Sequence, residues 1–292
     1  MIAFKLWSNF GVFRDPLTIT QNITFGIPPK TTIGGMLAAI LGIDYNDYFQ
    51  DESYFDFQYS VVLLNPIRKK SFAQNYIEDY TKKSENKFNA LADVYKTQPL
   101  LNKLIDTKIQ LKQKTYLSKR EIKILDGIEK KIIKANENYK KKMVNYDKNI
   151  SEKMPKPKPI QREILLNPSY LIFIKDYKYE DELYKAMISH QSAFTFYMGN
   201  SEFPANYEIE NCDNISELRI DQLDSFAINP ENIEFEVGKK YTLLHTATKV
   251  GKNRSYLDYK PIVISDGQIK YSDSINGFNI KTSRGEFNCE FI

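Results

Sequence analysis

The sequence predicts an α+β fold with a ferredoxin-like (RRM-like) core, a long helical insertion and a β-rich C-terminal part. Strand and helix periodicities follow the order strand, helix, strand, insertion, strand, helix, strand, which is the ferredoxin-like pattern. A lysine-rich stretch with helical spacing interrupts that order, and short strand-like runs separated by turns fill the end of the chain. We therefore expect the core in residues 1–77 and 159–205, the insertion in 78–158 and the β-rich region in 206–292.

Composition limits the class of protein. The chain has 292 residues, of which 42% are hydrophobic, so it can bury a sizeable core in one or two domains. No run approaches the roughly 20 apolar residues that span a bilayer, and the N-terminus alternates like a strand rather than a signal peptide. Two cysteines and two histidines fit no zinc-binding spacing. We expect a cytoplasmic protein with reduced thiols, no membrane segment, no metal and no cofactor.

The charge is unevenly distributed along the chain. Residues 78–158 contain 21 Lys and Arg against 11 Asp and Glu, whereas the remainder contains 20 against 26. A basic arm on a mildly acidic body suits phosphate contact or an acidic partner. The alternative is a solvated surface in a lysine-rich composition, and the sequence leaves both open.

The first helix is predicted from its ends and its periodicity. After a strand over residues 2–8 and a polar, Thr-rich loop to Pro29, the Pro pair and a threonine cap begin a helix that Gly42 ends. Gly34 and Gly35 leave one face of this helix almost bare. Either the helix packs tightly on a sheet, or its N-terminus binds a phosphate, and both can hold.

The insertion is expected to form a helical hairpin. Ser118 to Glu121 is a capping box that begins an amphipathic helix of about 30 residues. Pro99 is expected to begin an earlier helix, and Pro155 lies where the hairpin closes.

Signatures of catalysis are mostly absent from the sequence. There is no phosphate-binding P-loop, no nucleophile elbow and no zinc-protease motif. His190 and His245 could each act as a general base, but a helix end and a Leu-rich strand favour structural roles for them.

At the level of motifs, the sequence resembles the CRISPR-associated Cas-five family of the repeat-associated RNA-binding (RAMP) superfamily. Residues 4–42 carry the N-terminal signature, including Phe10-Gly11-Val12-Phe13-Arg14 and the helix beginning near Thr31. Weaker matches follow in order at residues 167–171, at the turn of residues 197–203 and from Arg254 to Pro261. Only the insertion is unmatched; a β-hairpin thumb is usual at that position in the family.

The resemblance implies a non-catalytic subunit that binds the 5′ handle of the CRISPR RNA in a type I interference (Cascade) complex, in the I-B branch. Its partners would be the CRISPR RNA, the backbone and large subunits and, through the complex, target DNA, so the chain would not work as a homo-oligomer. The alternative is a metal-independent endoribonuclease that processes precursor RNA. The insertion would reach a neighbouring subunit or a nucleic-acid backbone.

The expected RNA-binding residues lie in the Thr-rich loop, at the helix start and in the later turn, where cations, hydroxyls and helix amides would hold phosphates. They are Arg14, Thr18, Thr20, Lys30, Thr31, Thr32, Gly34, Gly35, Asn200 and Ser201.

Overall fold

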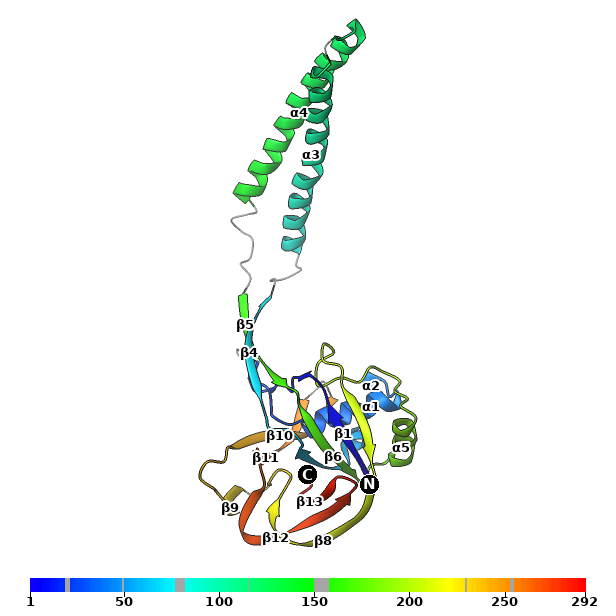
Figure 1. The fold of residues 1–292 in the computed structure, drawn as a ribbon, viewed down its shortest axis with the longest axis vertical. Coiled ribbons are helices and arrows are strands. Elements are labelled where there is room, and N and C mark those ends of the chain that lie inside the picture. The colour runs from blue at the N-terminus through cyan, green and yellow to red at the C-terminus, as the bar shows by residue number, and fades with distance from the viewer. Residues whose placement is uncertain are drawn as a thin grey trace. The chain divides into compact units, whose positions relative to one another are not determined.

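The computed structural model describes most of the chain and divides it into two compact units (Figure 1). Unit 1 comprises Met1–Ala73 and Ile160–Ile292, and unit 2 comprises Gln74–Pro159. The described residues are 1–18, 22–48, 50–76, 82–114, 116–149, 158–228, 230–252 and 255–292.

A four-stranded antiparallel sheet forms the centre of unit 1, with the strand order β3-β6-β1-β7. One helix follows β1 and another follows β6, so the elements run β-α-β-β-α-β with the insertion between the second and third strands. These elements are β1 (Ile2–Trp7), α1 (Lys30–Leu41), β3 (Gln58–Leu63), β6 (Ser169–Lys175), α5 (Glu180–Ile188) and β7 (Asn206–Glu210). The predicted α+β class is confirmed.

The remaining elements outside the helical insertion are short helices and strands. Among the described residues, three further sheets have the orders β2-β5-β4, β10-β11 and β13-β12-β8, with β9 on β12. Their bounds are β2 (Phe10–Gly11), β4 (Lys69–Tyr76), β5 (Lys158–Leu166), β8 (Cys212–Leu223), β9 (Ile233–Glu234), β10 (Tyr241–Gly251), β11 (Ser255–Ser265), β12 (Ile269–Thr282), β13 (Gly285–Cys289), α2 (Tyr45–Tyr48), and the 3₁₀ helices η1 (Glu52–Phe55) and η3 (Pro230–Asn232).

Both faces of the central sheet are buried. On one face, Phe4 and Leu6 pack into the main core with α1 and α5. On the other face, Phe173 packs with Ile280 of β12 and Cys289 of β13. A half-buried first strand was expected from its alternation, but Ala3 is as deeply buried as Ile2. The sheet therefore offers no open face for stacking bases, because the C-terminal strands cover it.

The ends of α1 differ in how well the sequence predicted them. Gly42 ends the helix in the left-handed conformation with φ 74°, as expected from its position. The expected threonine cap is wrong. Pro29 is the N-cap, and it makes no side-chain capping hydrogen bond; its carbonyl accepts from the amides of Thr32 and Ile33 at 2.9 and 3.0 Å.

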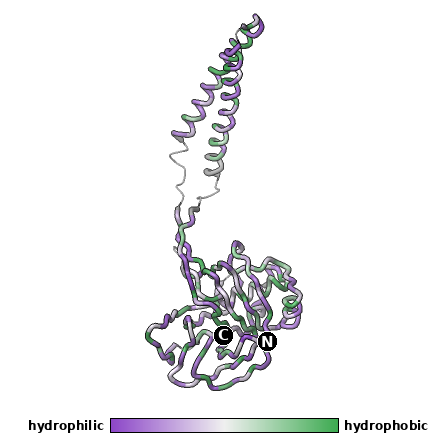
Figure 2. Tube along the Cα trace, in the orientation of Figure 1, coloured by the Kyte–Doolittle hydropathy of each residue, from purple (hydrophilic) through white to green (hydrophobic). Residues whose placement is uncertain are grey.

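Unit 2 contains two helices of equal length, α3 (Lys82–Lys112) and α4 (Lys119–Asn149). They are antiparallel, since Asp93 pairs with Lys142 while Lys108, later in α3, pairs with the earlier Glu129. Hydrophilic and apolar residues alternate along both helices (Figure 2). The predicted capping box forms: the Glu121 amide donates to Ser118 Oγ, and the Glu121 carboxylate accepts from the Ser118 amide at 2.9 Å.

Pro99 does not begin α3, contrary to expectation; it lies inside that helix. A proline in a helix interior removes one hydrogen bond and costs about 3 kcal/mol. Packing against α4 offsets this cost, with Val94 and Ile128 buried between exposed outer faces. Because of this tertiary contact, α3 begins at Lys82, seventeen residues before Pro99.

We expect Gly34→Ala to lower the free energy of unfolding by about 1–3 kcal/mol, the usual range for overpacking a core. A Cβ at this position would lie 2.7 Å from Cε1 of Phe55, whose ring is fully buried and cannot move aside. Thermal unfolding followed by circular dichroism measures the effect. Gly127→Ala in α4 is the matched control, because nothing lies within 4 Å of its added Cβ. Equal effects of the two substitutions would contradict the packing argument.

Candidate nucleic-acid interface

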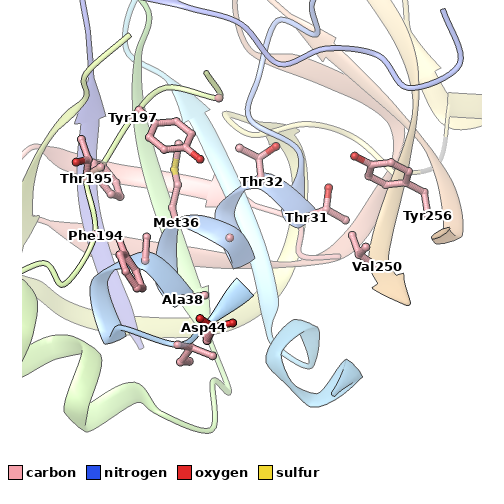
Figure 3. Close-up of a pocket in the computed structure, with 15 residues that line it drawn as sticks. Thr31, Thr32, Met36, Ala38, Asp44, Phe194, Thr195, Tyr197, Val250 and Tyr256 are labelled. Atoms are coloured by element: carbon pink, nitrogen blue, oxygen red, sulfur yellow. The ribbon is translucent and has the colours of Figure 1, made fainter. Parts of the chain in front are cut away.

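A cleft of about 450 Å³ lies over the bare face of α1 (Figure 3). One wall is the first half of α1, including Thr31, Thr32 and Gly35. A second wall is the loop of residues 194–199, and the third is formed by Val250 of β10 and Tyr256 of β11. In Figure 3, Tyr197 and Tyr256 stand on opposite sides of the helix start.

The two adjacent glycines of α1 have different roles. Gly34 is buried and faces Phe55, so it allows the helix to pack closely on the core. Gly35 lines the cleft. Gly34 thus fits the tight packing that the sequence offered as one alternative, and phosphate binding at the helix N-terminus stays a prediction.

Buried tyrosines hold the segment that leads into α1. The hydroxyl of Tyr59 donates to the carbonyl of Pro28, and that of Tyr170 donates to the carbonyl of Gly26 at 2.8 Å. Burial raises the pKa of both hydroxyls well above the ordinary value of tyrosine, so both remain protonated donors. The position of the helix start is thus fixed from within the core.

The loop wall is fixed at both ends by backbone hydrogen bonds. At its beginning, the Phe194 amide donates to the Ala39 carbonyl of α1 at 3.0 Å. At its end, the Val12 amide donates to the Met198 carbonyl at 3.1 Å. Gly199 follows with φ +85°, and a Cβ there would lie 1.8 Å from the Val12 carbonyl oxygen. Only glycine fits this position, which explains the turn that the sequence singled out.

The helix start offers donors to an anion. Of the first three amides of α1, that of Thr32 already donates to the Pro29 carbonyl, so the amides of Lys30 and Thr31 remain for an anion, at the end where the helix dipole is positive. The first turn of α1 contains no acidic residue, and the hydroxyl-bearing Thr31 and Thr32 both line the cleft. Asp44, at the other end of the cleft, is the acidic residue among its lining side chains. Negative charge is therefore favoured at the threonine end.

Three aromatic side chains line the cleft and remain accessible: Phe194 is 53% exposed, Tyr197 39% and Tyr256 44%. Exposed rings beside helix amides suit a ligand with both flat rings and phosphates. The sequence did not single out these rings for stacking, because most aromatic residues in a fold are core residues and exposure has no signature in sequence.

Lys30 does not line the cleft, although it was expected to bind phosphate. Its side chain is buried, with its Nζ 5.1 Å from the ring centre of Phe57. Burial, followed by repulsion from Lys260 and Lys249, lowers its pKa from 10.5 to about 8. Asp56 and Asp258 oppose this shift only in part. No carboxylate of the described residues lies within 4.0 Å of its Nζ.

The other expected residues are only partly brought together. Arg14 and Thr18 lie outside the cleft, where Arg14 donates to the Thr18 carbonyl at 3.3 Å. Thr20 lies outside the described residues. Asn200 and Ser201 directly follow Gly199 but do not line the cleft. Thr31, Thr32 and Gly35 are the expected residues that converge on it.

Neither histidine lines the cleft. The ring of His190 stacks on Tyr207 with centres 5.5 Å apart, and His245 lies on β10 opposite Pro261. In the described part of the chain, no three His, Cys, Asp or Glu residues gather as a metal site would require. Among those same residues, no helix is long and apolar enough to cross a membrane.

Unit 1 is thus an α+β protein unit with a cleft at a helix N-terminus, lined by hydroxyls and accessible aromatic rings. The model of the family described as "CRISPR-associated protein (Cas_Cas5)" matches residues 1–124, which include the whole of α1. Over this part the chain is similar to the CRISPR-associated Cas5 family. The resemblance stated from the sequence is confirmed at the level of the family.

No curated protein matches the chain. Among solved structures, a chain of "CRISPR RNA-guided surveillance complex" is similar with 9% identity and a TM-score of 0.46, covering 94% of this chain and 90% of that one. A chain of "Cryo-EM structure of the Type III-B Cmr-beta bound to cognate target RNA and AMPPnP, state 1" has 12% identity and a TM-score of 0.41, covering 92% and 86%. Both scores are below 0.5, so neither likeness carries the assignment.

We expect Lys30→Met to change how the stability of unit 1 depends on pH. The folded pKa of Lys30 is lowered to about 8, so between pH 8 and 10.5 the unfolded state binds more protons and stability rises with pH. From pH 7 to 9.5 this contributes on the order of 2 kcal/mol, which the variant lacks.

Urea unfolding at several pH values, followed by the fluorescence of the single tryptophan, Trp7, measures this dependence. Lys185→Met removes an exposed lysine and is the control; its profile should parallel that of the unmodified chain. A Lys30→Met profile parallel to both would show that Lys30 is not desolvated.

Proposed function

We propose that this chain is a non-catalytic subunit of a type I CRISPR interference complex, and that its cleft over α1 binds the 5′ handle of the CRISPR RNA. The carrying observation is the convergence of the α1 N-terminus, Thr31 and Thr32 with three exposed aromatic side chains around one cleft. The match of a CRISPR-associated family model to residues 1–124 supports the same function.

The threonine end of the cleft would hold a phosphate. Amide hydrogens at a helix N-terminus and two hydroxyls can donate to phosphate oxygens without reading the base sequence. A cleft at a fixed helix end also favours one position of the strand over others. The 5′ handle, which is the same in every guide of a given repeat, is the ligand that suits such a fixed site.

The aromatic side chains would hold unpaired bases. Single-stranded RNA exposes its bases for stacking, and each stack contributes about 1–3 kcal/mol. Tyr197 and Tyr256 flank the helix start, so bases on either side of the bound phosphate can each meet a ring. A duplex does not fit this arrangement, because its bases are already stacked on one another.

Within the complex, the chain would lie at the 5′ end of the guide beside the backbone and large subunits, and would meet target DNA only through them. The I-B branch is the subtype we propose, from the motif pattern of the sequence. The working form is then a single copy in a hetero-oligomer in the cytoplasm.

Catalysis is not part of this proposal, because the two histidines lie apart from the cleft that would hold the RNA. His190 is stacked on Tyr207 and His245 is exposed on β10, and neither lines the wall that would position a ribose 2′-hydroxyl. A general base must lie within hydrogen-bonding reach of the proton it removes.

We expect Tyr197→Leu and Tyr256→Leu each to weaken binding of a labelled handle RNA roughly 10- to 100-fold, because each removes one stacking ring. Fluorescence anisotropy at a fixed salt concentration measures the dissociation constant. Tyr184→Leu removes a ring of similar exposure on α5, outside the cleft, and should leave binding unchanged. If all three variants bound the handle RNA as tightly as the unmodified chain, the cleft would not be the RNA site.

Incubation of the purified chain with labelled repeat RNA, with and without EDTA, should leave the RNA intact. The expected result follows from the position of both histidines outside the cleft. Site-specific cleavage that His190→Ala or His245→Ala abolishes would make the endoribonuclease the correct function.

A further inference from the structure

Five exposed lysines form a stripe along the outer face of α4. Their spacings alternate between four and seven residues, which keeps them within a sector of about 60° at 100° per residue. At 1.5 Å per residue the stripe is about 33 Å long. The lysine stripe consists of Lys119, Lys123, Lys130, Lys134 and Lys141.

The acidic residues of unit 2 neutralise this stripe only in part. Glu137 lies within the same sector, three residues after Lys134 and four before Lys141, but among the described residues it forms no ion pair with either. Glu121 pairs with Lys114 and Glu129 with Lys108, so these carboxylates compensate charge on α3 and the loop. Within the stripe, Lys130 pairs with Asp126 at 2.9 Å. The four other lysines have no carboxylate within 4.0 Å among the residues that the structure describes.

The stripe repels itself, which points to a ligand that neutralises it. Lysines four residues apart, such as Lys119 and Lys123 or Lys130 and Lys134, face each other on one helix side, and like charges at this spacing destabilise a helix. Both helices also expose apolar side chains, such as Tyr95 of α3 and Ile133 of α4. The lysine stripe is therefore one sector of α4 and not the whole outer surface of the hairpin.

We propose that the lysine stripe binds the phosphate backbone of a nucleic acid, independently of base sequence and of the cleft on unit 1. Its length is close to one turn of a duplex, about 34 Å. Lysine acts as a mobile point charge toward phosphate, which suits contacts along a backbone that do not depend on base sequence. An acidic protein surface is the competing ligand. The stripe lies in unit 2, so this proposal stands even if the handle-binding function is wrong.

The test measures the salt dependence of binding for the full chain, using mixed-sequence probes that lack the handle. One probe is single-stranded RNA and the other is duplex DNA, which distinguishes guide from target. Replacing all five lysines by glutamine should reduce the slope of log K against log salt by up to about 4.5 for the duplex or about 3.5 for the single strand. Dividing each reduction by about 0.9 for the duplex and by about 0.7 for the single strand gives the number of phosphates contacted, and the probe with the larger number identifies the natural source of phosphate.

Two variants control for total charge and for fold. Five exposed lysines elsewhere, replaced together by glutamine, should leave the slope nearly unchanged; they are Lys96, Lys103, Lys178, Lys185 and Lys240. Arginine at the five stripe positions keeps the charge and should retain the slope. Helical circular dichroism checks that each variant is folded. An unchanged slope in the stripe variant, or a loss seen only in binding to other subunits of the complex, would overturn the proposal.

Handle RNA then separates this inference from the proposed function. The stripe variant should still prefer handle RNA over a scrambled RNA by the same ratio as the unmodified chain. Loss of that preference with an unchanged slope would contradict the stripe as a phosphate site.

Discussion

The close packing of α1 on the core is the constraint on which the candidate site depends. Gly34 brings the helix against the buried ring of Phe55, and Tyr59 and Tyr170 hold the preceding segment through its carbonyls. Because the helix start is fixed in this way, Gly35 and the two threonines face the cleft instead of the core. Gly34 therefore allows close packing on one side of the helix, and Gly35 leaves the backbone accessible from the cleft on the other side.

Coverage of the sheet explains why a binding site would form at a helix end. In a half-open sheet, side chains such as Phe173 would be available for stacking, but β12 and β13 bury that face. The accessible rings are instead carried by the loop of residues 194–199 and by β11. Gly199 packs against the Val12 carbonyl, so a segment almost 200 residues away in sequence holds this wall of the cleft.

The environment of Lys30 could not be predicted from its residue type. A lysine in the first turn of a helix invites a role in phosphate binding, yet this one is buried over Phe57 with a lowered pKa. Arg14 likewise turns toward its own loop. An exposed stripe of lysines instead runs along one face of α4.

Local features were determined by the sequence alone: the strand periodicity of β1, the glycine that ends α1, the capping box of α4 and the motifs within the family signature of residues 4–42. Each depends on neighbours within a few residues, so spacing suffices to predict it. Only the tertiary structure decided that Pro99 lies inside α3, that Pro29 caps α1 and that Lys30 is buried while Thr31 and Thr32 line a cleft. These outcomes depend on what packs against each residue from far along the chain, and no local pattern contains that information.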